Sequence, residues 1–187
     1  PAPPRRAWLA RTARAGQSAL LPTAVTGVGV LLVIAVGTPF HAAVLTSGVY
    51  RYASVSDPAS YQVPFYADGR TATVSVRRHV RSRMVTLATN GKPDASLSLD
   101  WIAPAPDDTA HRALAGDQVT QALLPLVALA HAPEARRAAV IGQGSGVTSH
   151  MLLASPALRE LATIDIEPEM IRGSRQFYPA NRRVFDD

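Results

Sequence analysis

The sequence contains no cysteine, which excludes disulfide bonds and thiolate metal sites from this chain. Aromatic residues make up only 6% of the 187 residues, and Lys92 is the only lysine. The formal net charge of +5 therefore rests almost entirely on arginine. Because these arginines are scattered and lack interleaved aromatic residues, we expect no nucleic-acid-binding face. No two histidines stand at i, i+4 from each other, so we predict no metal site either.

Charge is also absent from residues 18–40, which follow a basic segment at the start of the sequence. Residues 1–17 are rich in proline, arginine and alanine and predict a basic linker. Residues 18–40 carry no formal charge and are long enough for a helix that spans a bilayer. A buried apolar helix of a soluble domain and a secretory signal are the alternatives for this segment.

Residues 41–112 predict a small antiparallel β subdomain. Residues 71–77 and 84–89 alternate apolar with small polar side chains, which is typical of half-buried strands. Residues 67–69 and the pair Asn90-Gly91 provide turns, because glycine readily adopts positive φ.

Residues 113–187 change to an alternation of helices and strands. The predicted elements are a helix at 116–131, a strand at 138–142, a helix at 147–155, a strand at 161–166, a helix at 168–177, and the beginning of a third strand at Val184 and Phe185. Strands joined by helices at this spacing form a parallel sheet. The expected fold class is α/β, with an incomplete Rossmann-like domain that follows the β subdomain.

The first of these parallel strands runs into three alternate glycines. The loop consists of Gly142, Gln143, Gly144, Ser145 and Gly146. Glycines at such a strand end let the backbone turn sharply and approach a ligand, with the amides of the next helix directed at it. The spacing Gly-x-Gly-x-Gly differs from the dinucleotide fingerprint Gly-x-Gly-x-x-Gly. We therefore expect a nucleoside-thioether cofactor rather than NAD.

An acidic side chain about 20 residues after such a loop is expected to accept hydrogen bonds from a ribose diol. Asp165 is the first candidate and Glu167 the second. Asp117 and Gln121 share a helix face and are candidates for the substrate side of the same site, although Asp117 is equally suited to capping its helix. The alternative is an ordinary tight turn after the strand, with Asp165 capping the next helix.

Several ordered blocks of the sequence resemble the spermidine synthase-like (polyamine aminopropyltransferase) family, in particular its bacterial branch with membrane helices before the synthase domain. The blocks are residues 45–52, 68–74, 90–96, 120–124, 140–148, 165–169 and 181–187. The resemblance implies a methyltransferase-like Rossmann domain after a β-rich subdomain. It also implies transfer of an aminopropyl group from decarboxylated S-adenosylmethionine to a putrescine-like amine, without a metal.

In this family the three glycines contact the cofactor, and Asp165 stands where a glutamate binds the ribose. Ser145 stands where soluble synthases have an aspartate that holds the aminopropyl amine. The main catalytic acid of the family follows a third strand and is expected beyond Asp187, so the chain is expected to be a fragment in which no catalytic residue is assigned. The alternatives are another S-adenosylmethionine-dependent transferase, such as a methyltransferase, and a non-catalytic nucleoside-binding module on a membrane domain.

The resemblance also implies a location. We expect a bacterial membrane protein held by residues 18–40, with its nucleoside-binding domain in the cytoplasm; a wholly cytoplasmic protein is the alternative. Assembly into a homo-oligomer stays open.

Overall fold

The computed structural model describes residues 22–37, 40–102 and 116–186, and the chain divides into two units, one up to Phe40 and one from His41. The described part of the first unit is a helix over residues 22–36. No helix among the described residues is long and apolar enough to cross a bilayer, so the span predicted at 18–40 is not found there. Residues 18–21 and 38–39 of that span, and the linker predicted at 1–17, lie outside the described residues.

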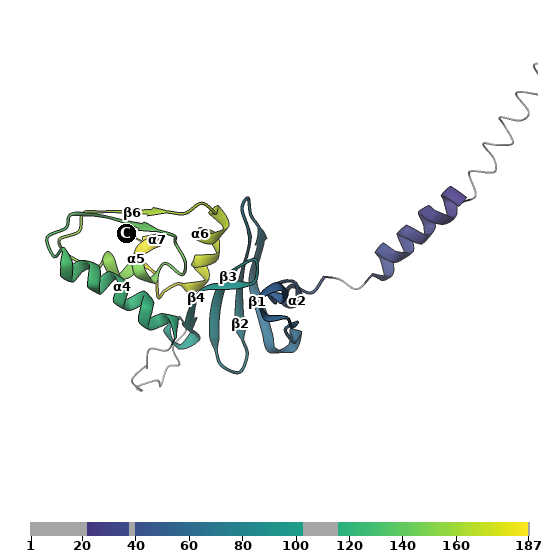
Figure 1. The fold of residues 1–187 in the computed structure, drawn as a ribbon, viewed down its shortest axis with the longest axis horizontal. Coiled ribbons are helices and arrows are strands. Elements are labelled where there is room, and N and C mark those ends of the chain that lie inside the picture. Colours follow the sequence, from purple (N-terminus) through teal and green to yellow (C-terminus); the bar gives the residue numbers. More distant parts are fainter. Residues whose placement is uncertain (1–21, 38–39, 103–115, 187) are drawn as a thin grey trace, which may run out of the picture. The chain divides into compact units, whose positions relative to one another are not determined.

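The second unit contains a four-stranded antiparallel sheet in the order β1-β2-β3-β4 (Figure 1). The strands are β1 (Tyr61–Asp68), β2 (Thr73–His79), β3 (Met84–Thr89) and β4 (Lys92–Ser98). This arrangement confirms the antiparallel subdomain, and β3 has the predicted bounds. Asn90 and Gly91 join β3 to β4 with φ of 49° and 77°. Positive φ at both residues matches the tight turn of a two-residue hairpin.

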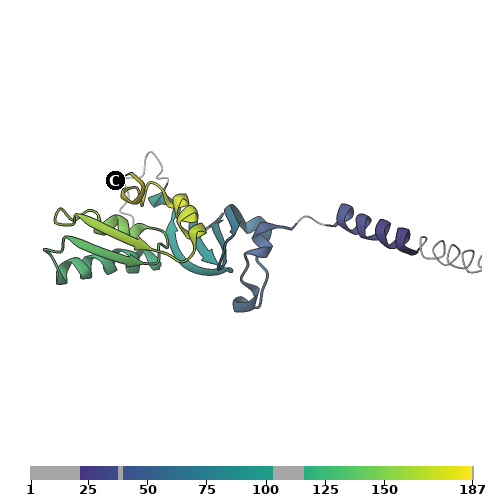
Figure 2. The same ribbon diagram turned by 90° about the horizontal axis from the view of Figure 1, so that it is seen from above.

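Opposite faces of this sheet are covered by different parts of the chain (Figures 1 and 2). One face packs against α6 (Pro168–Ser174) and η3 (Arg175–Phe177). The other face meets a segment with three short helices, α2 (Ala42–Leu45), α3 (Val49–Tyr52) and η1 (Pro58–Ser60). A further short helix, η2 (Leu99–Trp101), follows β4 directly.

The hydrophobic core lies on the α6 side of the sheet. Val76, Leu87 and Phe177 are each 0% exposed. Gly173 brings α6 close to the sheet, because a Cβ there would lie only 2.9 Å from Cδ1 of Leu87. Alternation along β2 and β3 directs one apolar set into this core and leaves the intervening side chains for the opposite face.

The rest of the second unit alternates helices and strands. Its elements are α4 (Asp117–His131), β5 (Arg137–Ile141), α5 (Val147–Leu152), β6 (Glu160–Ile164), then α6 and η3, and finally α7 (Arg183–Asp186). β5 and β6 are parallel, with Val140 opposite Thr163. The predicted strand–helix–strand order is thus confirmed, and the fold is mixed α/β. The boundary predicted between residues 112 and 113 lies outside the described residues.

The third strand predicted at Val184 and Phe185 is wrong, because both residues belong to the helical turn α7. The amide of Val184 donates to the carbonyl of Asn181, and that of Phe185 donates to the carbonyl of Arg182. These local bonds occupy the N–H groups that a strand would offer to a neighbour. The β preference of a valine–phenylalanine pair is therefore overridden locally.

Leu87→Ala tests whether the sheet–α6 core holds the second unit together. We expect the free energy of unfolding to fall by about 2–5 kcal/mol, because the lost methyl groups leave a cavity in a fully buried site. Urea denaturation followed by circular dichroism measures this change. Val80→Ala, in the exposed turn after β2, is the control and is expected to stay within about 0.5 kcal/mol. Equal losses in both variants would contradict this assignment of the core.

Candidate functional site

Two adjoining hollows lie beside the glycine loop, residues 142–146. The smaller, of about 230 Å³, is bordered by α4, β4 and the loop. The larger, of about 490 Å³, is bordered by the β1–β2 and β3–β4 turns and by the residues after β6. Asp94, Gly142 and Gly144 line both hollows. We treat them as one acidic cleft, which lies where β5 and β6 end.

The three glycines of the loop all have positive φ, at 90°, 50° and 81° for Gly142, Gly144 and Gly146. A Cβ on Gly142 would meet nothing within 4 Å, so bare backbone faces the cleft there. A Cβ on Gly146 would lie 2.8 Å from Nε2 of Gln143 and 3.2 Å from Nδ2 of Asn181. Gly142 thus leaves room for a ligand, whereas Gly146 is required by packing inside the protein.

Asp165 connects the glycine loop to the end of β6. Its Oδ2 accepts a hydrogen bond from the amide of Gln143 at 2.8 Å, and its Oδ1 accepts one from the amide of Glu167 at 2.9 Å. Each carboxylate oxygen has a second lone pair, so further donors can still be bound from the cleft. Asp165, the residue predicted to bind a ribose, therefore lines the cleft and also fixes the shape of the glycine loop.

Glu167 takes a role that the sequence did not indicate. Its buried carboxylate accepts hydrogen bonds from the amide and hydroxyl of Thr71, both at 2.7 Å, and from the amide of Ala72 at 3.2 Å. The amide of Glu169 donates to the other oxygen at 3.1 Å, so Glu167, rather than Asp165, caps α6. These donors, above all the Thr71 amide, lower the pKa of Glu167 to about 2. Glu167 therefore joins the β1–β2 turn to α6 while it lines the larger hollow.

Neutral residues hold the glycine loop against its surroundings. The buried side chain of Gln143 donates to the hydroxyl of Ser174 at 3.3 Å. Nδ2 of Asn181 donates to the carbonyls of Ser145 and Ser174, both at 2.7 Å. Gln143 thus faces the protein interior with its side chain, and only its backbone borders the cleft wall.

Gln121 of α4 lines the smaller hollow, but both polar atoms of its side chain form hydrogen bonds within the protein. The hydroxyl of Ser145 donates to Oε1 of Gln121, and Nε2 of Gln121 donates to the carbonyl of Ser96 at 2.9 Å. Ser145 also accepts a hydrogen bond from the amide of Val147 at 3.3 Å. Gln121 and Ser145 therefore hold α4, β4 and the loop together at the cleft.

Two further carboxylates line the smaller hollow. Asp117, in the first turn of α4, accepts a hydrogen bond from the hydroxyl of Ser96 at 3.0 Å. Asp94 of β4 accepts one from the hydroxyl of Thr89 and pairs with the exposed Lys92 at 3.4 Å. No sequence pattern marks Asp94 as a site residue, because only the packing of β4 beside the glycine loop brings it there.

The cleft is acidic in a chain whose formal net charge is +5. Four of its described lining residues are acidic, and none is arginine, lysine or histidine: Asp94, Asp117, Asp165 and Glu167. Such a lining favours a cation and repels a phosphate-bearing ligand. The described part of the chain contains no group of three or more side chains placed to hold a metal ion. His150 is not among the described lining residues of either hollow, and its Nδ1 accepts a hydrogen bond from the amide of Arg183 at 3.2 Å.

Comparisons with known proteins add no family to these observations. No model of a protein family matches this sequence, and a search of curated proteins finds no match either.

Stability in acid tests the role of Glu167. Its pKa is lower in the folded protein than the ordinary 4.5. Its contribution to stability is therefore complete above about pH 5 and is lost as the pH falls from about 4.5 towards 2. We expect the difference in unfolding free energy between the wild type and Glu167→Gln to shrink over this range in urea titrations.

Glu160→Gln is the matched control, because Glu160 pairs with Arg137 at an exposed position. Exposed pairs contribute little to stability. We expect a small difference from the wild type at every pH. A Glu167→Gln difference that stays constant from pH 7 to pH 2.5 would contradict the proposed role of its charge.

Proposed function

We propose that the acidic cleft binds an S-adenosyl-type cosubstrate, with decarboxylated S-adenosylmethionine favoured over S-adenosylmethionine. The observation that carries this proposal is the charge of the cleft: its described lining has four carboxylates and no cationic side chain. Decarboxylated S-adenosylmethionine bears a sulfonium and an ammonium and no carboxylate, so every formal charge on it is attracted by this lining. The carboxylate of S-adenosylmethionine, in contrast, would find no cation among these residues.

The glycine loop supports the nucleoside part of the proposal. The uncovered backbone at Gly142 offers space for a flat ring system next to the loop. Asp165 lies after the neighbouring strand and has acceptor capacity for ribose hydroxyls. In open parallel sheets, ligands bind beyond the carboxyl ends of the strands, which is where both features lie.

The reaction that we propose is aminopropyl transfer to a putrescine-like amine. The amine nitrogen attacks the methylene next to the sulfonium, a C–N bond forms and the C–S bond breaks. The electron pair of the broken bond goes to sulfur and produces methylthioadenosine. The amine must be neutral when it attacks, so its ammonium form loses a proton first. Alignment of the two reactants supplies much of the rate of such a transfer.

Asp94 and Asp117 are the residues that we assign to the cationic groups of the reactants. Ser145 is neutral and its hydroxyl is bound to Gln121, so it does not balance an ammonium charge. Asp94 and Asp117 line the same small hollow as Ser145 and supply that charge from β4 and α4. The acceptor of the amine proton is not assigned within this chain.

Calorimetric titration with decarboxylated S-adenosylmethionine, S-adenosylmethionine and methylthioadenosine tests the proposal. We expect the first to bind most tightly. Asp94→Asn should weaken decarboxylated S-adenosylmethionine roughly tenfold, as for the loss of one charged hydrogen bond, and leave uncharged methylthioadenosine within about twofold. Asp165→Asn should weaken all three ligands, because each carries the ribose.

Glu160→Gln, which removes an exposed carboxylate far from the loop end of the sheet, serves as the control for charge alone. Tighter binding of S-adenosylmethionine than of its decarboxylated form would favour methyl transfer instead. Absence of binding by all three nucleosides would contradict the proposed function.

A further inference from the structure

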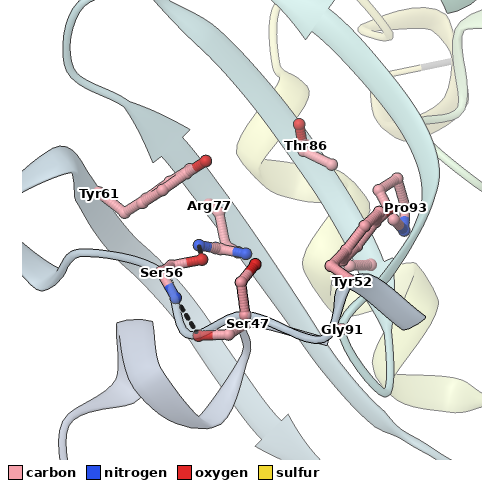
Figure 3. A pocket seen from close by; sticks show the side chains of 10 residues that line it. Ser47, Tyr52, Ser56, Tyr61, Arg77, Thr86, Gly91 and Pro93 are labelled. Carbon is pink, nitrogen blue, oxygen red and sulfur yellow. Dashed lines mark hydrogen bonds between the residues drawn. The ribbon is translucent and has the colours of Figure 1, made fainter. Parts of the chain in front are cut away.

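A second pocket lies on the face of the antiparallel sheet that is turned away from the core (Figure 3). It has a volume of about 440 Å³ and is formed between the sheet and the segment that carries α2, α3 and η1. Its main lining residues are Tyr52, Ser54, Ser56, Tyr61, Arg77 and Thr86. We call it the arginine pocket, and none of its lining residues belongs to the acidic cleft.

The pocket is held open by a close contact of two glycines. Gly48 and Gly91 both have positive φ, and a Cβ on either one would lie 2.5 Å from the backbone of the other. This contact joins the segment before β1 to the β3–β4 turn. The hydroxyl of Ser47 accepts a hydrogen bond from the amide of Ser56 at 3.0 Å and closes the segment on itself.

Arg77 supplies the only formal charge among the described lining residues of this pocket. Nη1 donates to the carbonyl of Thr46 at 3.0 Å, and Nη2 donates to the hydroxyl of Ser56 at 2.7 Å. The guanidinium lies over the ring of Tyr61, 3.9 Å from its centroid. Its position is therefore fixed by the protein before any ligand arrives.

The charge of Arg77 is not neutralised by the part of the chain that the structure describes. No carboxylate there forms an ion pair with it, and its buried Nε has no hydrogen-bond partner. Burial lowers the pKa of Arg77, which reflects water lost from the guanidinium without an anion in return. A partly buried cation of this kind is costly until it is paired.

From this geometry we infer that the arginine pocket binds a small organic monoanion, a carboxylate with a flat apolar body. One guanidinium balances the single charge of a carboxylate, whereas it would leave one charge of a phosphate dianion unbalanced. Figure 3 shows the hollow between Tyr61 and Arg77 on one side and Tyr52 and Pro93 on the other. These rings suit an apolar body, and the hydroxyl of Thr86 at the hollow offers one further polar contact.

The test uses benzoate as the probe and uncharged benzamide as its matched control, on the whole chain. A buried Arg77 Nε–H exchanges slowly enough to be followed by ¹⁵N–¹H NMR. We expect benzoate to shift this signal saturably and to raise the melting temperature, and benzamide to do neither. Inorganic phosphate at the same concentration is expected to have a much smaller effect.

Two variants separate binding from folding. Arg77→Met should weaken benzoate roughly tenfold or more, and Arg81→Met, an exposed arginine of the following turn, should not. Arg77 also holds the segment before β1 in place, so its loss affects folding as well as binding. Thr86→Leu is therefore a second variant, which fills the hollow with an apolar side chain and keeps the charge of Arg77. We expect it to abolish the benzoate shift.

An unsaturable shift, an equal response to benzamide or phosphate, or full benzoate binding by Thr86→Leu would each overturn the inference. None of these outcomes depends on a nucleoside in the acidic cleft. The two proposals can therefore fail separately.

Discussion

The carboxylate of Glu167 is surrounded by donors from two parts of the chain that are almost a hundred residues apart. The amide and hydroxyl of Thr71 and the amide of Ala72 donate from the β1–β2 turn, and the amide of Glu169 donates from the start of α6. Without these bonds a buried charge would be left uncompensated, so the antiparallel sheet and α6 are held in one relative position. The core around Leu87 and Phe177 is packed between the elements that this contact brings together.

The acidic cleft follows from this junction. Asp165, two residues before Glu167, uses its two oxygens to hold the amides of Gln143 and Glu167. The residues that follow β6 thus fix both neighbours of this strand end: Glu167 holds the β1–β2 turn and Asp165 holds the glycine loop. Gly69 belongs to this arrangement, because a Cβ there would lie 2.2 Å from the Glu167 carboxylate. A ligand in the cleft would meet walls that are already organised, which lowers the entropic cost of binding.

Two regions of opposite charge border the antiparallel sheet, one beside its edge strand β4 and the other on the face that the segment before β1 covers. Asp94 and Asp117 lie on the side of the glycine loop, whereas Arg77 lies on the face that the segment before β1 covers. Alternation along β2 produces part of this separation, since Val76 points into the core and the next side chain, Arg77, points away from it. One sheet can therefore support a site for cations and a site for anions without their charges neutralising each other.

Much of the fold was predictable because it depends on interactions among a few adjacent residues. The alternation of apolar and polar residues predicted β3, and the pair Asn90-Gly91 predicted its turn, because both depend on a few adjacent residues. The glycine loop was predictable for the same reason, since positive φ is a local property of the backbone. Asp165 was found by its spacing from that loop. Val184 and Phe185 were misjudged because local hydrogen bonds outweigh β preference there.

The amino-acid sequence by itself therefore determined β3 with its turn, the strand–helix–strand order of β5, α5 and β6, the glycine loop and the acid that follows it. Only the tertiary structure decided which side chains meet across these elements. Asp94 reaches the cleft because β4 packs beside the glycine loop, Glu167 becomes a junction because α6 packs on the sheet, and Arg77 faces a pocket because the segment before β1 folds back over β2. Such contacts join residues far apart in sequence and depend on how whole elements pack, which no short pattern of residues encodes.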